Sequence, residues 1–230
     1  MVRTVSASTA LLLAASSALT FSEAALEYKI RVRNLTYLQP FSPMMVFTHT
    51  KDIQAFQVGQ EVFPEFRTLV EDGDLSELLE LQFDEEIFQF VCAFSVNEDG
   101  LAPAGEKWFT LLVDENICSD GIYFSMFSML VNTNDAFVGI DTMLLDKKHS
   151  ATVYPPAYDA GTEENNELCS HIPGPACDTT SGNLPTESGE GFVQVHRGFH
   201  GIGGELSVDD YDWRNPVAEV FISKPSRVHS

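Results

Sequence analysis

Residues 26–33 read Leu-Glu-Tyr-Lys-Ile-Arg-Val-Arg, with an apolar side chain at every second position and a charged side chain between each pair. Strict alternation of this kind places the apolar side chains on one face of an extended chain and the charged side chains on the other. The stretch therefore predicts a β-strand with one face buried and the other in water.

Further strand-like runs follow along the chain, separated by turn-forming clusters such as Asn97-Glu-Asp-Gly100. Many short strands with Gly- and Pro-containing turns are typical of a β-sandwich or barrel. The polar stretch 155–190 interrupts the series, and loops of that length are usually functional or disordered. The chain has no internal repeat, so we expect residues 25–230 to form a single domain. The further predicted strands are 44–49, 87–96, 107–113, 121–131, 136–145, 149–154, 191–197 and 217–223.

Residues 54–81 have helical instead of alternating periodicity. Gly73 is placed to end a first helix, and Asp74 is placed to cap a second one over 75–81, where Glu77 completes a capping box. We therefore expect an all-β protein with one or two short helices packed on a sheet. The residues with helical spacing in the first helix are Phe56, Val62, Phe66, Leu69 and Val70.

The first 24 residues are expected to be a secretory signal peptide, which predicts a secreted, extracellular protein. Residues 10–21 form an apolar run that is too short to span a bilayer as a helix, and Ser22-Glu-Ala24 offers the small residues that signal peptidase reads. We predict cleavage after Ala24; the alternative is an uncleaved membrane anchor. No later segment approaches about 20 apolar residues, so the mature chain is expected to have no membrane span.

The formal net charge is -21. Residues 1–24 contain one Arg and one Glu, so the mature chain keeps this value. Nucleic acids and anionic membrane surfaces would be repelled, and we exclude them as partners. The charge favours cations instead.

Secretion also determines how the four cysteines are interpreted, because disulfides form in oxidising compartments. Cys169 and Cys177 flank a Pro-Gly-Pro turn that brings them together. Cys92 and Cys118 form the natural second pair; the alternative is two buried free thiols. Asn34, in Asn-Leu-Thr, is an N-glycosylation acceptor.

Acidic residues gather where two predicted strands give way to loops, in 132–141 and 158–163. Calcium requires roughly six to eight oxygen ligands, mostly carboxylates with some carbonyls. Gly161 permits a sharp turn that lets Asp159 and Glu163 converge, and Asp135 can join them from a neighbouring strand. The alternative is a set of ordinary solvated loop acids, because no EF-hand pattern is present.

Two other clusters offer competing sites. His196 and His200, together with His171, are the residues of an alternative function, a secreted metal-dependent hydrolase. Their Gly-rich surroundings do not hold a helical register, which favours structural histidines. The acidic run 209–212 is either a second cation site or a solvated loop. The chain has no nucleophile elbow and no phosphate-binding glycine motif, so we expect no enzyme activity.

Several stretches together carry a more specific signal. They are Tyr28-Lys-Ile-Arg-Val-Arg-Asn-Leu-Thr36, Gln39-Pro-Phe-Ser-Pro43, Asn134-Asp-Ala-Phe-Val-Gly139, Tyr158-Asp-Ala-Gly-Thr-Glu163, His171-Ile-Pro173 and Pro216-Val-Ala-Glu-Val220. In combination they resemble the spondin domain family, the domain of F-spondin and mindin, in its free-standing microbial form. The resemblance covers roughly residues 27–223.

The resemblance implies a C2-like antiparallel β-sandwich with calcium bound at one end by Asp135, Asp159 and Glu163. The chain departs from the family pattern in two places, with Ala136 in place of an aromatic residue and Glu163 in place of Asp. Asp141 lies near in sequence, but the resemblance does not support it as a ligand. The implied function is extracellular adhesion or recognition of a protein or glycan ligand. A purely structural matrix component is a further alternative.

Overall fold

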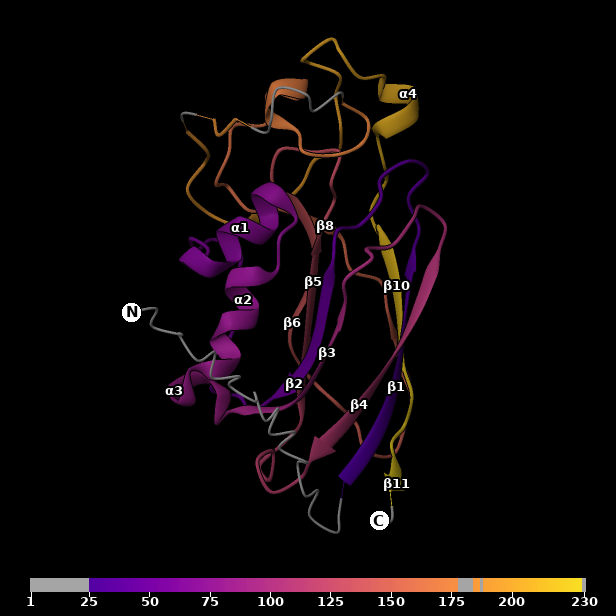
Figure 1. Ribbon diagram of the computed structural model, residues 1–230. Helices are drawn as coiled ribbons and strands as arrows, with labels where there is room; N and C mark the ends of the chain where they lie inside the picture. The colour runs from indigo at the N-terminus through magenta and orange to yellow at the C-terminus, as the bar shows by residue number, and fades with distance from the viewer. Residues whose placement is uncertain (1–24, 178–183, 187, 229–230) are drawn as a thin grey trace, which may run out of the picture.

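β1 (Ala25–Asn34) lies at the centre of the first of two antiparallel sheets, and its side chains alternate between buried and more exposed positions as the sequence predicts. The computed structural model describes residues 25–177, 184–186 and 188–228, so the predicted signal peptide lies outside the described residues. Within this part of the chain the fold is an all-β antiparallel sandwich with short helices on one side (Figure 1).

The first sheet is built around β1. Along one edge β1 pairs with β4 (Glu106–Asp114) over most of its length. Along its other edge it pairs with β10 (Ala218–Ile222) and then with β11 (Ser226–Val228). β7 (Ala151–Val153) continues the sheet beyond β10.

The second sheet has the strand order β3-β2-β5-β6-β8-β9. Its two central strands, β5 and β6, are buried on both faces over much of their length. The strands are β2 (Met44–His49), β3 (Val91–Asn97), β5 (Tyr123–Met129), β6 (Ala136–Leu144), β8 (Ala157–Asp159) and β9 (Gln194–Val195).

The main hydrophobic core lies between the two sheets. The inward side chains of β1 meet those of β2 and β5 there, which explains why alternating positions of β1 are apolar. The fully buried members of this core include Tyr28, Ile30, Val32, Met44, Val46, Leu111, Phe124, Met126, Val138 and Val220.

A second core lies on the opposite face of the second sheet, where the helices pack (Figure 1). Phe66 of α1 (Pro64–Asp72) contacts the rings of Phe127 and Phe137, which project from β5 and β6. α2 (Ser76–Glu80), the 3-10 turn η1 (Leu81–Phe83) and α3 (Glu85–Phe88) follow. Among the residues that the structure describes, the second sheet is therefore covered on both faces and the first on one.

The structure confirms the two predicted helices and changes their bounds. The first begins only at Pro64, because proline suits the first turn of a helix, and it ends at Gly73, whose φ is 71°. The Asp74 carboxylate accepts a hydrogen bond from the Ser76 backbone N–H. The predicted cap at Asp74 is wrong by one residue, because the N-cap of the second helix is Leu75, whose side chain makes no capping hydrogen bond.

Two strand predictions and one loop prediction differ from the structure. The prediction that a strand starts at residue 87 is wrong: the Asp84 carboxylate accepts from the Glu86 N–H and starts α3, so β3 begins at Val91. The predicted loop 155–190 contains β8 and the 3-10 turn η2 (Cys169–His171). The predicted strand 191–197 is reduced to the two residues of β9.

Both predicted disulfides are present, Cys92–Cys118 and Cys169–Cys177. The first links β3 to the loop between β4 and β5, and the second joins the first residue of the 3-10 turn η2 to Cys177, eight residues later. Among the described residues no helix is long and apolar enough to cross a membrane.

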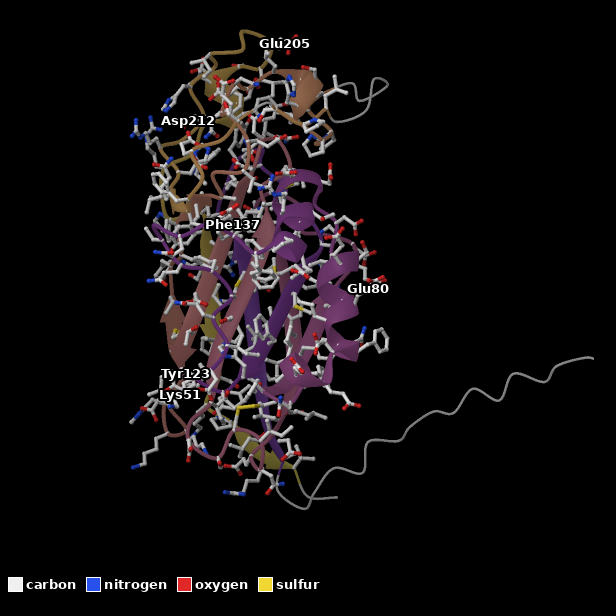
Figure 2. The ribbon with its side chains drawn as sticks, turned by 90° about the vertical axis from the view of Figure 1, so that its left-hand side faces the viewer. Lys51, Glu80, Tyr123, Phe137, Glu205 and Asp212 are labelled. Carbon is white, nitrogen blue, oxygen red and sulfur yellow. A yellow bond between two sulfur atoms is a disulfide. The ribbon has the colours of Figure 1, made fainter. Side chains whose placement is uncertain are left out.

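The long connections after β8 gather at one end of the sandwich, together with α4 (Val208–Tyr211) (Figure 1). Glu205 and Asp212 lie at this end in Figure 2, whereas Lys51 and Tyr123 lie at the opposite end. The candidate site lies where these connections meet the ends of β6 and β8.

Candidate metal centre

The structure places Asp135 and Asp159 on adjacent strands. Asp135 immediately precedes β6, Asp159 is the last residue of β8, and Ala136 pairs with Asp159 across the two strands. Asp135, Asp159 and Glu163 are 0%, 4% and 1% exposed. They are therefore not the solvated loop acids that spacing alone also allowed.

The Asp135 carboxylate is held by the turn that follows β8. Its Oδ2 accepts hydrogen bonds from the backbone N–H groups of Thr162 (2.7 Å) and Glu163 (3.0 Å) and from the Thr162 hydroxyl (3.2 Å). Its Oδ1 is buried and makes no hydrogen bond among the described residues. Burial, helped by the charge of Asp159, raises the pKa of Asp135 to about 8.

The Asp159 carboxylate is more fully bonded. Oδ1 accepts from the Gly161 N–H at 2.7 Å, and Oδ2 accepts from the side-chain amides of Asn165 (2.8 Å) and Gln194 (3.1 Å). Burial raises the pKa of Asp159, although these hydrogen bonds oppose the shift. Each carboxylate oxygen has two lone pairs, so these bonds leave acceptor capacity for a cation.

The Glu163 side chain is placed differently from the two aspartates. Its Oε1 accepts from the Thr186 backbone N–H at 3.1 Å, and its Oε2 is buried without a hydrogen-bond partner in the described part of the chain. Burial raises the pKa of Glu163 to about 7, and the charges of Glu71 and Asp72 at the end of α1 add to the shift. The Glu163 carboxylate is thus close enough to α1 to respond to its acids.

The structure therefore pairs Asp135 with Asp159 and ties the Glu163 backbone to Asp135. Over residues 25–177, 184–186 and 188–228, no group of three or more His, Cys, Asp or Glu side chains converges to hold a metal ion. The donor chemistry still suits a hard cation, since two buried carboxylate oxygens, one on Asp135 and one on Glu163, accept no hydrogen bond from any residue that the structure describes.

Gly161 makes this arrangement possible. Its φ is +70°, and a Cβ at this position would lie 2.7 Å from the Phe192 backbone nitrogen and closer still to the Phe192 carbonyl oxygen. No larger residue fits without moving the strand that carries Gln194. Glycine is thus required at position 161 for two reasons, the positive φ of its backbone and the close approach of the Phe192 backbone.

We expect Gly161→Ala to lower the free energy of unfolding by about 2–3 kcal/mol, because left-handed strain and the clash with Phe192 add together. Gly191→Ala is the matched control: its φ is +78°, but a Cβ there would have nothing within 4 Å. It should lose only about 1 kcal/mol in urea unfolding. Equal losses in the two variants would contradict the role of the close approach.

Several polar residues at this site carry no sequence signal of their own. Asn165 donates to Asp159 and accepts from His196 Nε2 at 3.1 Å, so its amide joins the acidic pair to the histidine. Buried Glu167 accepts from the backbone N–H groups of His200 (2.6 Å) and Ile202 (2.7 Å). These contacts come from loops far apart in the sequence, and only the fold brings them together.

The rings of His196 and His171, two of the three histidines of the alternative site, are hydrogen-bonded within the protein, whereas the hydrogen bond of His200 is made by its backbone N–H. Gly198 N–H donates to His196 Nδ1 at 3.1 Å, so His196 Nε2 carries the proton that Asn165 accepts. Burial lowers the pKa of His196 to about 4, which keeps the ring neutral. His171 Nδ1 lies 2.6 Å from the Leu184 carbonyl oxygen. Both ring nitrogens of His196 are therefore occupied.

Of the remaining candidates, Asp212 and Asp141 are also bonded within the protein. Asp212 accepts from the Phe199 N–H and pairs with Arg214, whereas Asp209 and Asp210 are exposed. Asp141 accepts from the Ala55 N–H at 2.7 Å, which places it in the contact between β6 and the loop before α1.

Asn34 is only 1% exposed. Its Nδ2, the atom to which an N-linked glycan would attach, donates to the carbonyl oxygens of Gln39 (2.8 Å) and Leu101 (3.4 Å). Glycosylation at Asn34 stays a sequence prediction, and it would require at least one of these contacts to break, because the attached nitrogen keeps only one hydrogen.

Comparison with models of known protein families gives no match, and comparison with curated protein sequences gives none either.

Proposed function

We propose that the protein is a secreted calcium-binding module of the spondin type that recognises an extracellular ligand and has no catalytic role. One observation carries the calcium proposal: buried carboxylate oxygens of Asp135 and Glu163 have no hydrogen-bond partner among the described residues. Buried polar atoms without a partner are rare in folded proteins, and a bound cation is one of the few explanations.

Asp135, Asp159 and Glu163 are the residues proposed to hold the ion. Bound calcium supplies positive charge that offsets the three buried carboxylates. The residues themselves position the loop: Asp135 fixes the turn at Thr162 through three hydrogen bonds, and Asp159 holds Asn165 and Gln194. Calcium binding is therefore expected to make the loop end of the sandwich more rigid.

We expect calcium to raise the melting temperature of the purified protein and chelator to reverse the change, because an ion that binds only the folded state stabilises it. Asp159→Ala should abolish this rise. Asp210→Ala is the matched control, since it removes the same charge from an exposed position on α4 and should keep the full calcium response.

The measurement is differential scanning fluorimetry at micromolar calcium, with magnesium as a parallel arm. An unchanged wild-type melting temperature on adding chelator would rule out the calcium site. An equal loss of response in Asp159→Ala and Asp210→Ala would show that calcium acts through overall charge.

A further inference from the structure

Within the described residues no helix covers the outer face of the first sheet (Figure 1). This face carries a row of aromatic side chains. The strand registers place Trp108 of β4, Arg31 of β1, Phe221 of β10 and Thr152 of β7 side by side. We call Trp108, Arg31 and Phe221 the aromatic row. The row runs across the sheet, perpendicular to the strands.

The guanidinium of Arg31 links the two rings of this row. Its central carbon lies 5.8 Å from the Trp108 ring centroid and 5.9 Å from that of Phe221, and the two rings are 6.3 Å apart. Trp108 is nevertheless 51% exposed. A large aromatic side chain held in place by its neighbours, and still open to solvent, is a surface prepared to bind something.

Polar groups with fixed positions flank the row. Glu219 pairs with Arg31 at 2.5 Å and accepts from the Tyr154 hydroxyl at 3.3 Å. On the same side Arg33 pairs with Glu106 at 2.8 Å. Hydrogen-bond donors and acceptors are thus already oriented beside the aromatic surface.

The charges on this face cancel. Lys29, Arg31 and Arg33 are each paired with a carboxylate, so three cations balance three acids, whereas the whole chain carries -21. On this face, as far as the chain is described, every one of these cations is already paired, and the overall charge repels an anionic ligand. The ligand that fits this face is therefore uncharged. The three acids are Glu27, Glu106 and Glu219.

We propose that this face binds a neutral, linear polysaccharide lying along the aromatic row. The C–H face of a pyranose packs on an aromatic ring, and its hydroxyls exchange charge-assisted hydrogen bonds with the flanking Arg and Glu side chains. Neighbouring strands are about 4.8 Å apart, close to the length of one pyranose ring, so successive sugars can follow successive strands. This inference names a ligand for the proposed recognition function and does not use the metal centre.

Isothermal titration calorimetry with defined hexasaccharides tests the proposal. The probes are the β-1,4-glucose, β-1,3-glucose, β-1,4-xylose and β-1,4-mannose hexamers, with a galacturonic acid hexamer as the anionic counterpart. We expect at least one neutral hexamer to bind and the anionic one not to bind. Trp108→Ala should weaken binding at least about tenfold, and Trp108→Phe should restore part of it.

Phe83→Ala is the control variant, because Phe83 is a second exposed aromatic (80%) on the helical side of the molecule, and it should bind as the wild type does. Absence of binding by every neutral hexamer, or unchanged binding by Trp108→Ala, would overturn the proposal. So would sugar-independent dimerisation that Trp108→Ala abolishes, since the row would then be a contact between two copies. The titrations are repeated in chelator. Sugar binding that persists in chelator would show that the aromatic row works without calcium, so the two proposals can fail independently.

Discussion

Phe66→Ala is expected to lower the free energy of unfolding by about 3–5 kcal/mol, which is the usual cost of removing a fully buried phenylalanine. Phe66 is 0% exposed and joins α1 to the second sheet. Its ring meets those of Phe127 and Phe137 edge-to-face, with centroids 4.9 and 5.1 Å apart. The small alanine side chain would leave a cavity between helix and sheet that the surrounding rings cannot fill.

Urea unfolding followed by circular dichroism measures this loss. Phe83→Ala, an exposed position on the same helical side, should cost less than about 0.5 kcal/mol. A loss below about 1 kcal/mol for Phe66→Ala would mean that the helices contribute little to the stability of the sandwich.

The second large effect concerns Asp135 in the metal-free protein. Folding raises the pKa of this carboxyl from 3.8 to about 8, so the folded chain binds the proton more tightly than the unfolded chain does. Stability contributed by such a group is present at low pH and is lost as pH rises toward 8. Asp135→Asn should remove this loss, because its amide oxygen can accept the same N–H groups without a buried charge.

In chelator at pH 8.5, Asp135→Asn should therefore be more stable than the wild type by a few kcal/mol, and the difference should shrink toward pH 7. Calcium should reverse the order, since it stabilises only the wild type. The range from pH 7 to 8.5 avoids the titration of His196, whose lowered pKa destabilises the fold only under more acidic conditions. Equal stability of the two proteins at pH 8.5 would show that Asp135 is not held as a buried charge.

The sequence predicted the sandwich because its strands are patterned locally. Alternation in β1 needs no knowledge of its partners, and both disulfides follow from turn chemistry and an even number of cysteines. The strand predicted from residue 87 failed for a local reason as well. Apolar Ile87 and Phe88 continue the apolar pattern of β3, but they lie in a helix because the Asp84 carboxylate caps its first turn.

The site could be predicted only in part. Proximity of Asp135 and Asp159 follows once β6 and β8 are neighbours, and the sharp turn at Gly161 is visible in the sequence. The direction of the Glu163 side chain cannot be predicted from the sequence, because it depends on Thr186 and on the end of α1, both distant along the chain. Glutamate has one more rotatable bond than aspartate, so its carboxylate position is set by tertiary contacts.

The two sheets also differ in how freely they can evolve. Six of the seven positions of β5 are buried, and the strand supplies side chains to both cores, so a change on either face of that strand disturbs packing. On β1 every second residue faces solvent, and its neighbours on β4 and β10 do the same. These outward residues can therefore be substituted one at a time with little effect on the two cores, while the fold that supports them stays unchanged.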